Sequence, residues 1–316
     1  MQPSNEGDPI PPNDNLYSPA NHDFYKHQPY QPLDRHVQEV RLLRVTKDVD
    51  GSLLCTLTDG IPLAEARDTY TAISYCAGDP NTRPLLVNGY HFNAFANLVH
   101  AIEEAYNHRT DRSVNKVVLW ANQMVINQSD ATERSHQVGF MRAIYSNAQE
   151  VAVCLSTTNV DSDAISWIER VYEQIPELES VPAFFAAQTT FVERDDDIVP
   201  GILREPLERF GSYVHSNLHD GRFVGCWLQV LEMVAQPWWR RAWVLQEYVT
   251  APDARFFYGG KAILWKPLTA VLLTLFTTRE WILNGTLYDT YQRFSPLRLT
   301  ELERKTPSLT VCRRAV

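Results

Sequence analysis

The chain has 316 residues, of which 44% are hydrophobic and 21% are charged, and its formal net charge is −9. This composition is ordinary for a folded protein and excludes collagen-like, coiled-coil and fully disordered chains. An acidic chain with dispersed Lys and Arg is also a poor nonspecific binder of nucleic acid or anionic membranes, because neutralising phosphates requires clustered cations.

The lack of a recognisable membrane span or secretory signal and the cysteine usage both favour a cytoplasmic protein. No run of about 18 uncharged apolar residues is present, so no membrane span is expected. The N-terminus lacks the basic segment and apolar core of a secretory signal. The five cysteines are far apart and odd in number, which disfavours a disulfide framework or a zinc site and fits a reducing compartment.

The N-terminal part predicts a leader followed by strands. Residues 1–32 are rich in proline and poor in apolar side chains, which indicates disorder. Strands are predicted at 40–45 and 53–57 around an Asp50-Gly51 turn, and again at 70–75. Residues 85–87 and 90–92 flank Asn88-Gly89, a pair that favours a type I′ hairpin.

The middle of the chain alternates between helix and strand. We predict a helix at 93–106, a strand at 117–120, a helix capped at Asp130 and Glu133, a strand at 151–155 and a helix at 161–174. Such alternation indicates an α/β fold with a mostly parallel central sheet flanked by helices, to which the β-hairpins are additions.

The C-terminal part predicts helices at 201–216 and 223–234, a Trp-rich helix from Pro237 to near Tyr248, a hairpin at 254–265 and a final helix at 267–284. The last thirty residues show little periodicity. We therefore divide the chain into a disordered leader (1–32), an α/β domain with a helical C-terminal part (33–285) and an irregular tail (286–316).

Three segments together resemble the fungal heterokaryon incompatibility domain: YTAISYCAG (Tyr70–Gly78), LWANQMVINQ (Leu119–Gln128) and PWWRRAWVLQE (Pro237–Glu247). They occur in the family's order with plausible spacing, and the resemblance covers roughly residues 30–270. It implies a role in nonself recognition and programmed cell death after fusion of unlike fungal cells. A protein partner or self-association would be the mode of action.

Three positions depart from the family's usual pattern. Ala77 stands where a Trp is usual, Asn122 where an Asp is usual, and Val125 where a Cys is usual. Members of the family usually continue beyond the position where this chain stops, so the tail is consistent with truncation. A degenerate, non-catalytic copy is therefore an alternative interpretation.

The family's fold is thought to be distantly TIR-like, and some TIR domains hydrolyse NAD. The WVLQE segment is similar to the one that carries their catalytic glutamate. This implies an alternative function, an NAD glycohydrolase with Glu247 as the catalytic carboxylate and NAD as substrate, with no cofactor and no metal assigned. On a helix from Pro237, Arg240, Trp243 and Glu247 would share one face, and a carboxylate there could stabilise an oxocarbenium-like transition state. A structural Glu–Arg pair is the competing interpretation.

Further candidate ligand-binding residues lie at or just after the ends of two predicted strands. In open α/β sheets, ligands bind at the carboxyl ends of the strands. The competing interpretation is structural, with a glycine supplying a positive φ angle and amides tying down the loop ahead of the Asp130 cap. The candidates are Ser74, Tyr75, Gly78, Asn122, Asn127 and Gln128.

Overall fold

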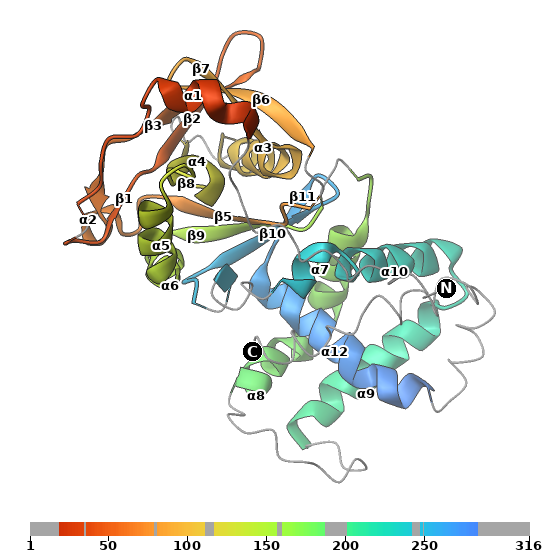
Figure 1. Ribbon diagram of the computed structural model, residues 1–316. Helices are drawn as coiled ribbons and strands as arrows, with labels where there is room; N and C mark the ends of the chain where they lie inside the picture. Colours follow the sequence, from red (N-terminus) through yellow and green to blue (C-terminus); the bar gives the residue numbers. More distant parts are fainter. Residues whose placement is uncertain are drawn as a thin grey trace, which may run out of the picture.

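The computed structural model describes residues 19–34, 36–78, 81–110, 117–156, 160–186, 201–241, 247–248 and 250–283. Within these ranges a nine-stranded sheet has the order β11-β10-β9-β5-β8-β2-β3-β6-β7 (Figure 1). Strands β10, β9, β5 and β8 run parallel to one another. The edges are hairpins with antiparallel strands. The predicted α/β class with a mostly parallel centre is therefore confirmed.

The strand positions follow the sequence pattern closely. The large sheet contains β2 (Leu43–Lys47), β3 (Leu53–Leu57), β5 (Thr71–Tyr75), β6 (Thr82–Val87), β7 (Tyr90–Phe95), β8 (Val117–Trp120), β9 (Glu150–Cys154), β10 (Ala254–Tyr258) and β11 (Lys261–Leu264). Two short strands, β1 (Glu39–Val40) and β4 (Ile61–Pro62), pair separately. The single strand predicted at 40–45 is thus divided, and the buried Arg41 lies in the break.

Burial explains why the central strands read as continuous apolar runs. Every residue of β5, β9 and β10 is buried, as expected for strands covered on both faces. By contrast β2 alternates between buried and exposed residues. Asn88 and Gly89 both have positive φ angles, of 51° and 81°, which confirms the predicted type I′ turn between β6 and β7.

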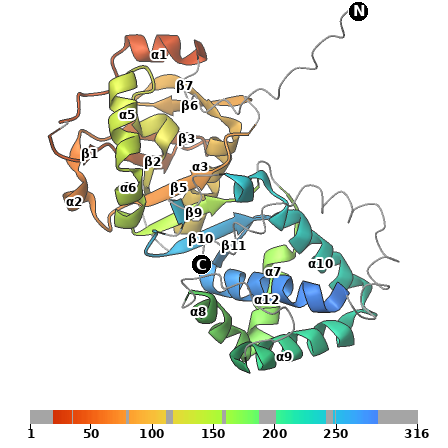
Figure 2. The same cartoon turned by 60° about the horizontal axis from the view of Figure 1, so that its bottom comes forward.

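Helices connect the parallel strands on opposite faces of the sheet. Helix α3 (Ala96–Thr110) leads from the β6–β7 hairpin to β8, and α5 (Ala131–Gly139) and α6 (Met141–Asn147) lead from β8 to β9 on the other side of β5 (Figure 2). Right-handed crossovers in opposite directions place their helices on opposite faces. The predicted Asp130 cap is confirmed, since its side chain accepts from the backbone N–H groups of Thr132 and Glu133.

Two helix predictions need correction. The helix expected at 93–106 begins only at Ala96, because residues 93–95 pair with β6 as the end of β7. The helix expected after Asp130 is two helices, since the backbone of Phe140 (φ −126°, ψ 21°) leaves the helical region between α5 and α6.

The C-terminal helices gather beyond the β10–β11 end of the sheet (Figure 1). They are α7 (Ala164–Gln174), α8 (Ser180–Ala186), α9 (Gly201–Asn217), α10 (Gly221–Val234) and α12 (Trp265–Leu283). Among the described residues, no helix is long and apolar enough to cross a membrane.

Part of the expected leader packs on the domain. Residues 19–26 form a short 3-10 helix η1 (Pro19–Asn21) and helix α1 (His22–Lys26), and Phe24 is only 2% exposed. Residues 1–18 and the tail from 286 onward lie outside the described residues. The three-part division of the chain stays a prediction.

Candidate functional site

The candidate site lies where the carboxyl ends of β5 and β8 meet. These strands are neighbours: the chain passes from β5 through the β6–β7 hairpin and α3 to β8, and then through α5 and α6 back past β5 to β9. The topological switch point, which is the usual ligand crevice of open α/β sheets, lies on the other side of β5, because the chain leaves β5 toward β8 but leaves its other neighbour β9 toward β10. The structure brings Ser74, Tyr75, Asn122 and Gln128 together where β5 and β8 end, whereas Asn127 lies in a different network.

Polar contacts join the two strand ends. The Tyr75 hydroxyl donates to Asn122 Oδ1 at 3.3 Å, and the Gln128 side-chain amide donates to the Asn122 carbonyl at 2.8 Å. Asn122 opens a short helix α4 (Asn122–Val125), where its side chain also accepts from the Gln123 N–H. Burial raises the pKa of Tyr75 well above its ordinary value, so this phenol is a hydrogen-bond donor.

Gly78 has the positive φ angle that its position requires, 59°. A Cβ atom there would lie 2.7 Å from Nδ2 of Asn97 on α3. That amide donates to the carbonyls of Cys76 and Ala77, at 2.9 and 3.0 Å. The glycine therefore lets α3 approach and hold the loop that leaves β5.

Glu247 is buried against the same strand. Its carboxylate accepts a hydrogen bond from the Ser74 hydroxyl and two from Arg241, at 2.9 and 2.8 Å. The Trp238 indole N–H donates to Ser74 Oγ at 2.7 Å. Residues separated by more than 160 positions in the sequence thus share one polar cluster, which we term the Glu247 cluster (Ser74, Trp238, Arg241 and Glu247).

The predicted helix from Pro237 to Tyr248 is wrong in its first part. The 3-10 helix η3 (Pro237–Arg240) ends before Arg241, whose backbone is extended (φ −75°, ψ 136°). Arg240 is exposed and does not share a helix face with Glu247, which pairs with Arg241 instead. Trp243 lies outside the described residues.

The electrostatics of the Glu247 cluster favour a closed ion pair. Glu247 has no exposed surface, whereas the Arg241 side chain is 23% exposed. Burial alone would lower the pKa of Arg241, but the charge and hydrogen bonds of Glu247 raise it above its usual value. Both carboxylate oxygens are engaged in these hydrogen bonds, so a substrate that needs a free carboxylate oxygen would have to displace Arg241 or Ser74.

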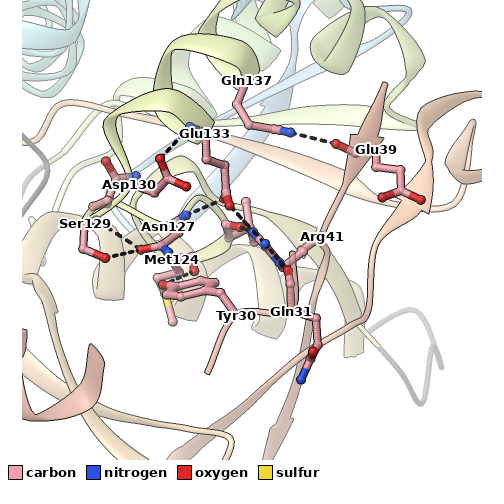
Figure 3. A network of polar contacts seen from close by, with 12 residues as sticks. Tyr30, Gln31, Glu39, Arg41, Met124, Asn127, Ser129, Asp130, Glu133 and Gln137 are labelled. Atoms are coloured by element: carbon pink, nitrogen blue, oxygen red, sulfur yellow. Dashed lines mark hydrogen bonds and ion pairs between the residues drawn. The ribbon is translucent and has the colours of Figure 1, made fainter. Parts of the chain in front are cut away.

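A second buried network flanks the loop after β8 (Figure 3). Arg41 donates to Glu133 on α5 at 2.6 and 3.1 Å, to the Val125 carbonyl at 3.2 Å and to the Gln31 carbonyl. The Tyr30 hydroxyl donates to the Met124 carbonyl at 2.9 Å. Hydrogen bonds therefore link the segment before β1, at Tyr30 and Gln31, to helix α4.

Asn127 belongs to this second network and not to the polar contacts that join the ends of β5 and β8. Its N–H donates to Glu133 at 2.7 Å, and its side chain accepts from the N–H and hydroxyl of Ser129. A pocket of about 400 Å³ lies beside the network, lined by Pro32, Leu33, Asp34, His36, Asp130, Glu133 and His136. Among the described residues, no group of His, Cys, Asp and Glu is placed to hold a metal ion.

Sequence reasoning missed several residues that shape the site. Tyr145 on α6 donates to the Ile73 carbonyl at 3.1 Å, and its burial next to Glu247 raises its pKa. On α3, His100 lies 3.2 Å from Ser156 Oγ, just after β9. The adjacent residues Arg240 and Arg241 in the sequence indicated that an arginine could pair with Glu247. Which of the two forms the pair depends on where the 3-10 helix η3 ends.

The three departures from the family pattern occupy packed positions. Val125 is 2% exposed, Ala77 is half-buried, and both carbonyls accept hydrogen bonds. The Asn122 side chain has two donors directed at its Oδ1, from Tyr75 and the Gln123 N–H. A carboxylate would accept the same two bonds, so Asn122 keeps the local structure while removing a titratable group.

Comparisons with known proteins agree on one family. The family model described as heterokaryon incompatibility protein (HET) matches residues 70–247. The Neurospora crassa protein named "Heterokaryon incompatibility protein 6, OR allele" is 26% identical over 171 residues, which cover 51% of this chain and 23% of that protein. The chain thus spans about a quarter of the length of this relative. No solved structure matches significantly.

Proposed function

Because the chain belongs to the heterokaryon incompatibility family, we propose that it acts in fungal nonself recognition and programmed cell death. We place this action in the cytoplasm, through association with a protein partner or with a second copy of the chain. The Neurospora relative is named for heterokaryon incompatibility, which supports the assignment of the biological process.

One observation carries the proposal: the first and last blocks of the matched segment contact each other. The family match runs from Tyr70 to Glu247, and Ser74 in the first block donates to Glu247 in the last. The second block of the matched segment contacts the first through the hydrogen bond from Tyr75 to Asn122. The motif residues thus build one buried scaffold, as expected of a module whose surface carries the recognition.

Inducible expression in a fungal host tests this proposal. We expect expression of the full chain to reduce viability, and we expect the effect to survive Glu247→Gln when folded protein levels are matched. Recovery of a partner, or a mass that rises with concentration in light scattering, would support association. A chain that is harmless, monomeric at every concentration and free of partners would contradict it.

An NAD glycohydrolase is the second candidate, and the position of Glu247 favours it. The carboxylate lies beside Ser74 near the carboxyl end of β5, next to the topological switch point. A buried carboxylate at a ligand crevice could stabilise positive charge on a ribose. Its enclosure by Arg241 means that catalysis would require this ion pair to open.

Nicotinamide release from NAD by the purified protein separates the two candidates. Turnover by the wild type that disappears in Glu247→Gln would establish the enzyme, provided that the variant keeps its thermal transition. Absence of turnover by the folded wild type would remove this candidate.

Toxicity gained only by combining Ala77→Trp, Asn122→Asp and Val125→Cys would instead identify a degenerate copy.

A further inference from the structure

The edge strand β7 is covered by residues that precede the family segment. The register of the β6–β7 hairpin, which Val87 and Tyr90 close around a two-residue turn, fixes which backbone groups face outward. By alternation, His91, Asn93 and Phe95 direct their N–H and C=O groups away from β6. Pro84, which has no N–H, lies opposite Asn93 and fits this assignment.

Side-chain amides take the place of a neighbouring strand. The Asn21 amide donates to the Asn93 carbonyl at 3.0 Å and accepts from the Asn93 N–H at 2.6 Å. These are the two hydrogen bonds that a strand residue added at this edge would make. The N–H of Phe95 donates to the side-chain oxygen of Gln123 at 2.9 Å. Asn21 is 1% exposed, so water does not compete for its bonds.

Aromatic contacts anchor the same segment. Phe24 packs edge-on against Phe92 with ring centroids 5.0 Å apart, and His27 stacks on Tyr90 at 4.0 Å. Helix α1 accordingly lies along β7 at the end of the sheet (Figure 1). We term residues 19–27 the edge plug.

We propose that the edge plug covers a strand-addition site, and that β7 of a second copy is the strand that replaces it. This inference rests on the association proposed above and names its partner. Residues 90–95 (YHFNAF) contain no Lys, Arg, Asp or Glu. Antiparallel self-pairing about a two-fold axis would therefore oppose no like charges. An edge strand without lysine or proline is also the kind that pairs readily once uncovered.

Variants of the full chain test the proposal by light scattering. The change Asn21→Ala with Phe24→Asp uncovers the His91–Asn93 part of β7, while Gln123 still covers Phe95. We expect the mass of this variant to double as concentration rises while the wild type stays monomeric. Adding His91→Pro removes an outward N–H from β7 and should restore the monomer. His91→Pro alone is the matched control. A folded, uncovered chain that stays monomeric, or one that dimerises despite His91→Pro, would overturn the proposal.

Two further measurements keep the test decisive if the double variant folds poorly. Asn21→Ala alone keeps the Phe24 anchor, and we expect it to accelerate hydrogen exchange of the Asn93 N–H at least tenfold. Unchanged exchange would contradict the plug. A synthetic peptide of residues 16–30 should return the uncovered chain to monomer. Self-association through another surface would leave the general association proposal standing while excluding β7.

Discussion

Two of the buried arginine–glutamate pairs, Arg41–Glu133 and Arg241–Glu247, lie at the candidate site, and they differ in which partner is more deeply buried. In Arg41–Glu133 the arginine side chain is 1% exposed and the glutamate 9%. In Arg241–Glu247 the glutamate is fully buried and the arginine is 23% exposed. Both pairs are bidentate, so they have the same hydrogen-bond geometry and differ in how far each partner is exposed to solvent.

This difference indicates that the Arg41–Glu133 pair is structural, whereas a ligand could separate Arg241 from Glu247. Arg41 also donates to two backbone carbonyls, so it has no surface to offer a ligand. The Arg241 side chain is partly exposed to solvent, whereas the carboxylate that it binds is fully buried. An anionic group could compete for that guanidinium, whereas nothing similar can happen at Arg41.

The largest expected effect comes from removing one carboxylate charge at a time. Glu133→Gln leaves the sealed Arg41 unpaired and should lower the free energy of unfolding by about 3–5 kcal/mol. Glu247→Gln should cost about 1–3 kcal/mol, because Arg241 can regain water through its exposed part. Urea unfolding of both variants at neutral pH measures the difference.

An exposed pair supplies the control for this comparison. Arg83 and Glu103 are also bidentate, at 3.0 and 2.8 Å, but their side chains are 48% and 33% exposed. Glu103→Gln should change the free energy of unfolding by less than about 1 kcal/mol. Equal losses for Glu133→Gln and Glu247→Gln would show that burial of the partner left behind does not set the cost.

The next effect tests how rigid the strand end beside Glu247 is. Gly78→Ala places a Cβ in the left-handed region and against Asn97, so we expect a loss of about 2–4 kcal/mol. Gly89→Ala is the matched control, since its φ is also positive but no atom lies within 4 Å of the added Cβ. It should cost about 1 kcal/mol. Thermal unfolding of both variants gives the comparison, and an equal cost would mean that the Asn97 contact relaxes freely.

The sequence predicted local structure well and distant pairing poorly, and the two pairs show why. Strand limits, the Asp130 cap and the type I′ turn follow from residues within a few positions of each other. Arg41 and Glu133 are 92 positions apart, and Ser74 and Glu247 are 173 apart. Such contacts depend on the order of the strands in the sheet, which local sequence patterns do not determine. Assuming one continuous helix also assigned Glu247 to Arg240 instead of Arg241.

A smaller effect concerns a buried titratable group outside both ion pairs. Burial lowers the pKa of His100 below its ordinary 6.5, a shift that the nearby Glu103 partly opposes. As pH falls, the unfolded chain therefore binds this proton first, and stability is lost from about pH 6.5 downward. His100→Gln should remove part of this slope. Chemical denaturation between pH 5 and 8 measures it, and an unchanged slope would show that His100 has the same pKa in the folded and unfolded chains.

The smallest effect is kinetic and returns to Arg241. Burial raises the pKa of the Cys55 and Cys154 thiols to about 12, so their thiolates are scarce at pH 8 and alkylation should be slow. Cys76 is half-buried and lies within electrostatic range of Arg241, so it should react before Cys55 and Cys154. Glu247→Gln breaks the ion pair that holds Arg241 and leaves its charge uncompensated near Cys76, so iodoacetamide labelling of Cys76 should become about two- to fivefold faster. Glu133→Gln should not change that rate in folded protein. Peptide mapping by mass spectrometry distinguishes the cysteines, and equal acceleration in both variants would mean that unfolding, and not the Arg241 charge, exposes the thiol.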